Sequence, residues 1–355
     1  MKAIMDRTTG TQRVTAIATS LIALTLSLPV QGQVTAQLRA AAGYPLGNFI
    51  GPTAPGGGVV EGHHFWGCDG FDSFIRYNPA DPNNPDPINT GMLFIDGTSI
   101  VSNIMTKCAQ AAYDGNQTVF VADYENRKGS GGTARIGGVK RLVFNLLNDT
   151  LANQQGIAAT AGLDGDNPTA VALGPDGNVY VGFLKNGNVK RIVGPYLGTT
   201  QAVQSVGATP NGRPMRAMAF VGSDLYLASS DSLSVIHNAV SPLCQGGCNA
   251  QVVQDSFTGS GHVGLTTDGA NLLYMAINNQ VWRYSLATGI STLIATSGID
   301  PSGVNLAFIF QGGRTNLLQL DGQGNLWIGD DPSDGLVNFQ GRVFYISAAA
   351  LSTIP

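Results

Sequence analysis

The stretch from Asn167 to Ile192 reads NPTAVALGPDGNVYVGFLKNGNVKRI and contains the unit that decides the fold. A short apolar segment, Ala170–Leu173, is followed by Asp176-Gly177-Asn178 and then by the aromatic segment Tyr180–Phe183. Asp-Gly pairs between apolar runs are typical of tight hairpin turns. A third segment, Asn188–Ile192, places Arg191 next to apolar residues. The stretch therefore predicts three consecutive antiparallel strands.

The same unit recurs along the chain. The second predicted strand carries an aromatic residue about every fifty residues, at Trp66, Phe120, Tyr180, Tyr226, Tyr274 and Trp327. A small residue follows one or two positions later in each copy, at Gly67, Ala122, Gly182, Ala228, Ala276 and Gly329. In four copies the third strand contains an arginine, at Arg76, Arg141, Arg191 and Arg283. A fourth strand is visible more weakly, for example in Gly289–Ile294.

Repeats of this length favour one architecture. Four-stranded units of about fifty residues bury their faces against neighbouring copies, and radial repetition leaves only short sheet edges. We therefore predict an all-β chain, a six-bladed β-propeller of four-stranded blades. The sixth copy ends close to Pro355, so we expect the N-terminal segment around Gln37–Phe49 to complete the last blade and close the ring. A β-sandwich or a β-helix fits the repeat length less well.

The N-terminus carries the features of a secretory signal peptide. Lys2, Arg7 and Arg13 precede an uncharged apolar run, Val14–Val30. We predict a signal peptide over residues 1–32 and one propeller domain over 33–355, with cleavage after Gly32 or alternatively after Ala36. The alternative, a retained membrane anchor, is less favoured because the run is short. The expected location is periplasmic or extracellular.

The four cysteines, Cys68, Cys108, Cys244 and Cys248, all lie in the predicted exported part. An even number in an oxidising compartment favours two disulfides, with three possible connectivities. The Gln-Gly-Gly spacer between Cys244 and Cys248 suits a local bond, which would leave Cys68 with Cys108. A metal or haem site fits this spacing poorly.

Composition limits the partners. The formal net charge is -4, with 19 Lys and Arg against 23 Asp and Glu, so nucleic acid is a poor candidate. Beyond the N-terminal run, no stretch is apolar enough to span a bilayer. No nucleophile elbow, phosphate-binding glycine loop or HExxH motif is present. We expect a monomer that binds a small molecule or a protein partner.

The candidate site residues follow from the propeller geometry. The first strand of each blade lines the channel, so residues just before or at its start are expected at the channel mouth: Lys107, Thr169, Arg216, His262 and Asn316. Asp69, Asp123 and Asp330 end second strands that would lie in adjacent blades. Their carboxylates would suit one divalent cation such as calcium, and His262 would suit a general base. The favoured alternative is that each Asp caps its loop or pairs with a third-strand Arg.

The segment Asn167–Gly182 and the following Asn188–Ile192 resemble an NHL repeat, and Asp321–Asp330 is similar to units of the wider NHL, gluconolactonase (SMP-30-like) and streptogramin-lyase group. The resemblance covers the predicted mature chain as a repeat pattern. It implies a six-bladed propeller. It also implies a choice between metal-dependent lactonases, lyases and interaction scaffolds. Glu61 lacks the Glu-Gly-Pro context of the lactonase ligand, so that role is not transferred.

Two functional hypotheses result. The first is an exported module that binds a ligand or partner through its channel-mouth face, where Arg216 would suit a carboxylate or another anion. The alternative is a metal-dependent hydrolase or lyase, lactonase-like, that acts on a small molecule in the channel.

Overall fold

A computed structural model of the chain describes about half of the residues. They are 39–40, 58–61, 64–68, 74–77, 108–114, 117–123, 127–128, 134–135, 138–145, 150–156, 167–196, 201–244, 247–255, 263–277, 280–296, 298–299, 305–306, 318–320, 324–330, 342–346 and 348–354. The chain divides into two units, Met1–Gln33 and Val34–Pro355, and every described residue belongs to the second. The predicted signal peptide therefore lies outside the described residues.

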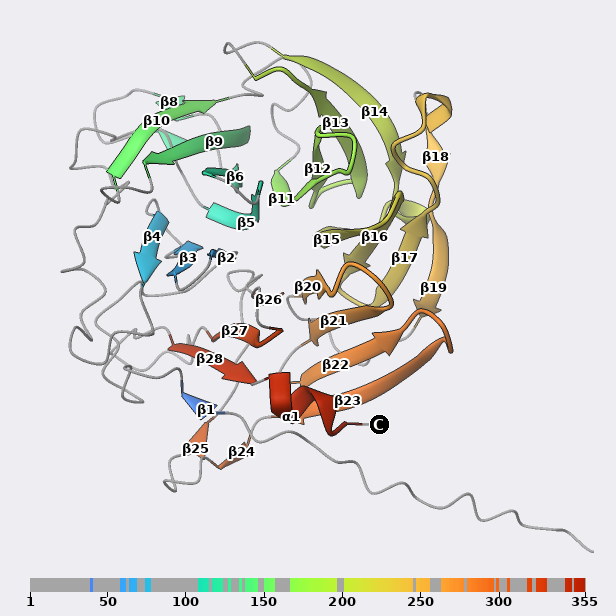
Figure 1. Cartoon of the computed structure of the whole chain (residues 1–355). Helices are drawn as coiled ribbons and strands as arrows, with labels where there is room; N and C mark the ends of the chain where they lie inside the picture. Colours follow the sequence, from blue (N-terminus) through green and yellow to red (C-terminus); the bar gives the residue numbers. More distant parts are fainter. Residues whose placement is uncertain are drawn as a thin grey trace, which may run out of the picture. The chain divides into compact units, whose positions relative to one another are not determined.

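The second unit is all-β, and its sheets are arranged as the blades of a β-propeller (Figure 1). In sequence order, the first main sheet contains β2 (Gly58–Glu61), β3 (His64–Cys68) and β4 (Phe74–Tyr77), and the second contains β5 (Cys108–Tyr113), β6 (Thr118–Asp123), β9 (Gly138–Asn145) and β10 (Thr150–Gly156). The third contains β11 (Pro168–Leu173), β12 (Val179–Phe183), β13 (Asn188–Val193), β14 (Ala202–Ala208) and β18 (Cys248–Asn249), and the fourth contains β15 (Met215–Val221), β16 (Asp224–Ser229), β17 (Ser232–Ile236) and β19 (Gln251–Asp255). The fifth contains β20 (Val263–Thr267), β21 (Leu272–Ile277), β22 (Gln280–Ser285) and β23 (Ile290–Thr296), and the sixth contains β26 (Leu318–Leu320), β27 (Leu326–Asp330), β28 (Arg342–Ile346) and β1 (Arg39–Ala40).

The remaining elements are small. Two short pairs complete the described strands: β7 (Arg127–Lys128) with β8 (Ala134–Arg135), and β24 (Gly298–Ile299) with β25 (Asn305–Leu306). The helical elements are 3₁₀ turns at Pro210–Gly212 and Pro242–Cys244 and the helix α1, Ala348–Ser352. Within the described part of the chain, no helix has the length and apolar character needed to cross a bilayer.

The strand pattern predicted from the repeat is confirmed in the described blades. The segment Ala170–Leu173 lies in β11, Tyr180–Phe183 in β12 and Gly289–Ile294 largely in β23. The pairing register also explains the recurring arginine, which lies directly across from the repeat aromatic on the neighbouring strand. The cross-strand pairs are Trp66 with Arg76, Phe120 with Arg141, Tyr180 with Arg191, and Tyr274 with Arg283.

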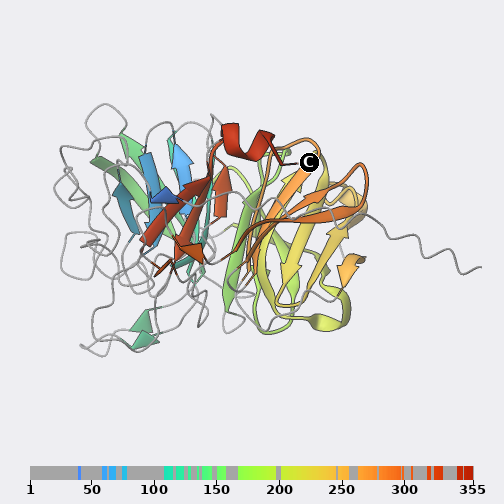
Figure 2. The same cartoon turned by 90° about the horizontal axis from the view of Figure 1, so that it is seen from below.

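The first strands of the blades lie next to one another at the centre. Contacts join β5 to β11, β11 to β15, β15 to β20 and β20 to β26. Figure 2 shows the blades from the side, with neighbouring sheets standing next to one another. Each first strand pairs within its own sheet along one edge only, so its other edge faces the centre.

Buried apolar clusters hold adjacent blades together. The Tyr180 ring contacts Phe220 of the next blade edge-to-face, with ring centroids 4.8 Å apart. Gly182 allows Met215 and Met218 of that blade to approach β12, since a Cβ there would lie 2.6 Å from Met215 Cγ and from Met218 Cε. The repeat aromatic thus fills the space between these two blades, and the small residue of the repeat permits their close packing.

The C-terminal residues form an element that the repeat did not predict. After β28 the chain forms α1, and Leu351 and Ile354 are buried in a cluster with Tyr274 and Leu326. β1 pairs antiparallel with β28, where Arg39 lies opposite Tyr345. The last described sheet thus combines N-terminal and C-terminal segments.

Candidate functional site

A central cavity with a volume of about 270 Å³ lies among the first strands of the blades. Its described lining comes from β5, β11, β15, β20 and β26. The lining side chains that can form hydrogen bonds are uncharged: Gln110, Tyr113, Thr266, Thr267 and Gln319. Among the described lining residues there is no Asp, Glu, Lys, Arg or His. The cavity can therefore hold a small molecule by hydrogen bonds and apolar contact without a charged side chain of the described lining.

Gln110 organises the wall of this cavity. Its Oε1 accepts hydrogen bonds from Val171 N and Met218 N, each at 3.1 Å. Its Nε2 donates to Met218 O, also at 3.1 Å. One buried carboxamide thus links three neighbouring first strands, β5, β11 and β15, through backbone groups on their free edges. Such groups otherwise cost free energy when they are buried without partners.

The cavity lies toward the ends of the first strands. Its lining includes Tyr113, Leu173 and Thr267, which are the last residues of β5, β11 and β20. The sequence analysis placed the site at the opposite end, where these strands begin. Gln110 was not predicted, because its partners are 61 and 108 residues away in the sequence and no local motif marks it.

The carboxylates near the strand ends are used by the turns themselves. Asp114 Oδ1 accepts hydrogen bonds from Gln117 N and Thr118 N. Asp268 Oδ1 accepts three hydrogen bonds, from the backbone N–H groups of Ala270, Asn271 and Leu272. Gly269, which follows Asp268, has φ +78°, a conformation that glycine adopts without strain. The predicted hairpin turns are confirmed at these positions, and their Asp residues stabilise turns.

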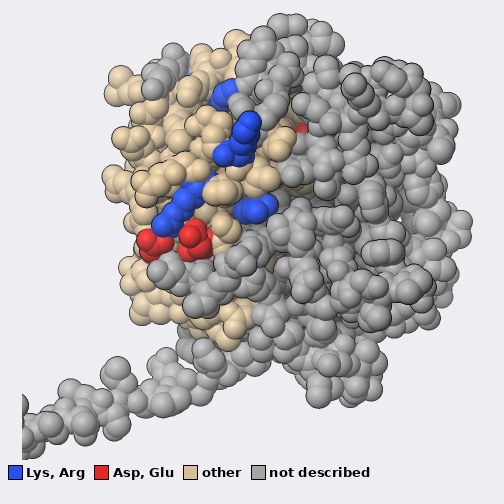
Figure 3. Space-filling view, turned by 180° about the vertical axis from the view of Figure 1, so that it is seen from behind, with Lys and Arg blue, Asp and Glu red and all other residues tan. Residues whose placement is uncertain are grey.

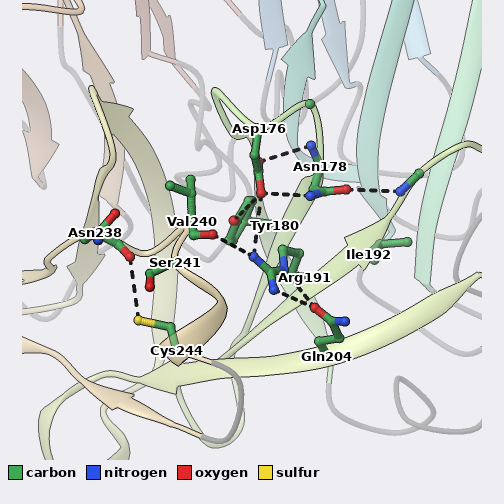
Figure 4. A network of polar contacts seen from close by, with 12 residues as sticks. Asp176, Asn178, Tyr180, Arg191, Ile192, Gln204, Asn238, Val240, Ser241 and Cys244 are labelled. Atoms are coloured by element: carbon green, nitrogen blue, oxygen red, sulfur yellow. Dashed lines mark hydrogen bonds and ion pairs between the residues drawn. The ribbon is translucent and has the colours of Figure 1, made fainter.

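A polar network extends from one such turn into the next blade (Figure 4). Asp176 Oδ2 accepts a hydrogen bond from Tyr180 Oη at 2.9 Å and lies 3.6 Å from Arg191 Nη1. Arg191, which is buried, also donates to Gln204 Oε1 and to Val240 O of the neighbouring blade. Burial raises the pKa of Tyr180 above its ordinary value, so the hydroxyl remains a donor. This network holds two blades together rather than contacting the cavity.

At the strand starts, the structure describes two of the five predicted channel-mouth residues. The register shifts at Thr169 in β11 and at Arg216 in β15, so each strand contains one extra residue there. Bulges of this kind redirect side chains and are common beside binding sites. Thr169 Oγ1 donates a hydrogen bond to Met215 O at 2.7 Å, which brings Thr169 next to the start of β15. Lys107, His262 and Asn316 lie outside the described residues.

Basic side chains gather near the start of β15. Figure 3 shows the face opposite to that of Figure 1, where blue side chains gather with red ones beside them. The hairpin after β12, with exposed Lys185, contacts the segment before β15 through Thr209 N and Gly187 O, which are 2.9 Å apart. Arg213, in that segment, forms an ion pair with Asp255 at 2.7 Å. This end of the blades is charged, unlike the cavity lining.

The predicted acidic residues are only partly described. Asp123 is fully buried at the end of β6, and its Oδ2 lies 3.6 Å from Nζ of Lys140 on the third strand. Burial lowers the pKa of Lys140, and the neighbouring Asp123 opposes this shift. The expectation of a third-strand partner is met by Lys140 instead of an arginine. Asp330 ends β27 with its backbone opposite Arg342, and Asp69 lies outside the described residues.

No described group of three His, Cys, Asp or Glu side chains is placed to hold a metal ion. The cation prediction therefore depends on Asp69 and other residues outside the described ranges. Lys140 already occupies one side of the Asp123 carboxylate, so this residue is a poor metal ligand.

The Cys244–Cys248 disulfide is present, with a Cα–Cα distance of 5.0 Å. It closes a loop whose strand β18 pairs in parallel with β14, at the outer edge of the preceding blade. Gly207 is required there because a Cβ would collide with Cys248 O. Cys68 and Cys108 lie on β3 and β5, which contact each other, and the bond between them stays a prediction.

No protein-family model matches the chain, and no curated protein matches it. Solved structures do. A gluconolactonase of Xanthomonas campestris is 11% identical, with a TM-score of 0.54 over 88% of this chain and 94% of that one. The calcium-binding protein regucalcin of Agrobacterium tumefaciens is 12% identical, with a TM-score of 0.53 over 88% and 94%. An auxiliary nutrient binding protein of Bacteroides thetaiotaomicron is 12% identical, with a TM-score of 0.54 over 89% and 78%.

These similarities show the β-propeller fold. At such identities they do not transfer an activity. The three proteins differ in what they bind or do, which fits a fold that hosts several functions.

Proposed function

We propose that the protein is an exported β-propeller that binds a small molecule or a protein partner through its central channel. The observation that carries this proposal is the cavity of about 270 Å³, which has a mixed lining of small apolar residues and uncharged hydrogen-bonding groups. Pockets that bind small molecules combine apolar walls with a few placed polar groups. The cavity differs in this from a site that binds a hard cation, where several carboxylates converge.

The proposal includes six blades of the NHL type, with a ring closed by the N-terminal segment. Two observations support the blade number: contacts also join β26 to β2 and β2 to β5, and six sheets of three or more strands are present among the described residues. The pairing of β1 with β28 supports closure by the N-terminal segment. Export follows from the signal peptide predicted over residues 1–32.

The strand starts form a second part of the proposal. Arg216 on its bulge, with Lys185 and Arg213 nearby, would favour an anionic group on a partner or ligand at that mouth. Lys107, His262 and Asn316 are proposed to belong to the same mouth.

A thermal-shift screen of small metabolites against the purified mature protein tests the proposal. A ligand at 100 times its dissociation constant stabilises the folded state by about 2.7 kcal/mol. We expect at least one compound to raise the melting temperature in a saturable manner, with or without a chelator. If stabilisation requires calcium or zinc, or if substrates are hydrolysed, the lactonase-like alternative takes its place.

A further inference from the structure

The carboxamide of Gln110 shows what the free edges of the first strands bind. Its carbonyl oxygen accepts from two converging N–H groups, Val171 N on β11 and Met218 N on β15. Its amide nitrogen donates to the carbonyl of Met218. The carboxamide is a neutral planar group with one acceptor atom and one donor atom, and it is held between two blades.

The same backbone arrangement recurs one step closer to the strand ends. Residues in a β-strand alternate in the edge toward which they point their N–H and C=O groups. The backbone N–H groups of Val171 and Met218 point toward the channel. The N–H and C=O groups of Leu173 and Phe220, two residues further along each strand, therefore point the same way. Both residues line the cavity. The edges of β11 and β15 therefore offer the cavity a second set of the groups that Gln110 uses.

We propose that the cavity binds an uncharged ligand through a carbonyl or carboxamide group, held between Leu173 and Phe220 in the manner of the Gln110 side chain. This inference rests on the proposed function and names the chemical class of its ligand. A carboxylate would be disfavoured, because the described lining holds no cation to offset its loss of hydration. The neutral hydrogen-bonding groups of Thr266 and Gln319 suit the rest of such a ligand.

The test compares two probes by backbone amide NMR of the full mature protein. The lactam 2-pyrrolidone presents a carbonyl and an N–H, whereas 4-hydroxybutyrate has similar size but carries a carboxylate. We expect 2-pyrrolidone to shift the Leu173 and Phe220 amide signals in a saturable manner in the millimolar range. The binding of 4-hydroxybutyrate should be at least about tenfold weaker, because the charge must lose its hydration.

A matched pair of variants checks the location. Gln319→Trp fills space in the cavity and should weaken 2-pyrrolidone binding at least about tenfold. Gln251→Trp makes the same change on the exposed outer strand β19 and should leave binding unchanged. If Gln319→Trp fails to fold, as judged by its melting curve, the amide shifts of the unmodified protein decide the question.

Equal binding of both probes, tighter binding of 4-hydroxybutyrate, or shifts confined to Thr169 and Arg216 would overturn the inference. These outcomes would leave a channel that binds ligands and so preserve the proposed function. The absence of any saturable shift with 2-pyrrolidone would also overturn the inference. The metabolite screen tests the proposed function independently.

Discussion

The two ends of the first strands differ in their chemistry. At the strand ends, the turn carboxylates of Asp114 and Asp268 are taken up by backbone N–H groups, and the cavity beside them is lined by uncharged side chains. At the strand starts, bulges at Thr169 and Arg216 and a buried Asp123–Lys140 pair place polar and charged groups. The comparison teaches that turn hydrogen bonds use the carboxylates of Asp114 and Asp268, while the described lining of the cavity beside them is uncharged.

The largest expected effect concerns the neutral end. Gln110→Leu leaves Val171 N, Met218 N and Met218 O buried without their partner. Each such group costs about 1–3 kcal/mol, so the free energy of unfolding should fall by at least about 3 kcal/mol. Urea denaturation measures this loss. Gln319→Leu, on the partly exposed lining of the same cavity, is the control and should change stability by less than about 1 kcal/mol. Equal losses would mean that Gln110 has no special role.

The next effect tests the network that holds neighbouring blades together. Arg191→Met removes the hydrogen bonds to Val240 O and Gln204 Oε1 and the ion pair with Asp176. Because the guanidinium is buried, we expect a loss of about 2–4 kcal/mol in the free energy of unfolding. Chemical denaturation checks the value. A near-neutral result would contradict the role given to the repeat arginine.

The dependence of the free energy of unfolding on alkaline pH tests whether the tyrosine hydroxyls between the blades are buried and neutral. Burial raises the pKa of several tyrosines above the ordinary value of 10.0: Tyr180, Tyr196, Tyr226, Tyr274 and Tyr284. The pKa of Tyr196 rises to about 12. Above pH 10 the unfolded chain releases these protons while the folded chain keeps them. Stability should therefore fall as pH rises through the raised pKa values, by up to about 1.4 kcal/mol per pH unit for each tyrosine.

The lowered pKa of Lys140 acts in the opposite direction and fades above its ordinary value of 10.5, so the tyrosines dominate the interval from about pH 11 to 12. Denaturation curves across that interval measure the slope. Tyr274→Phe should make the slope of the free energy of unfolding against pH less steep, by the contribution of one tyrosine proton. A slope that stays the same in this variant would contradict the burial of the Tyr274 hydroxyl.

The smallest effect is expected at the charged end. Arg213→Met breaks the ion pairs with Asp231 and Asp255, whose side chains are about half exposed. Exposed ion pairs contribute little, so stability should change by less than about 1 kcal/mol. Melting curves at low and high salt check this. A loss as large as that of Arg191→Met would remove the distinction between the surface and the buried network.

Much of the blade pattern could be predicted from the sequence because it is local. The Asp-Gly turns, the aromatic second strands and the Cys244–Cys248 bond each depend on residues a few positions apart. The cavity could not be predicted, because Gln110 and its partners meet only when three blades are assembled. The helix α1 and the strand β18 could not be predicted for a similar reason, since they are stabilised by contacts with other blades.

The central claim is that the channel holds its ligand by strand edges and uncharged side chains rather than through a metal ion. The most direct test is elemental analysis of the purified mature protein by mass spectrometry before and after a chelator, with a melting curve on each sample. The account predicts no stoichiometric metal and the same melting temperature in both samples. One tightly held calcium or zinc ion per chain, with stability lost on its removal, would contradict it and favour the hydrolase.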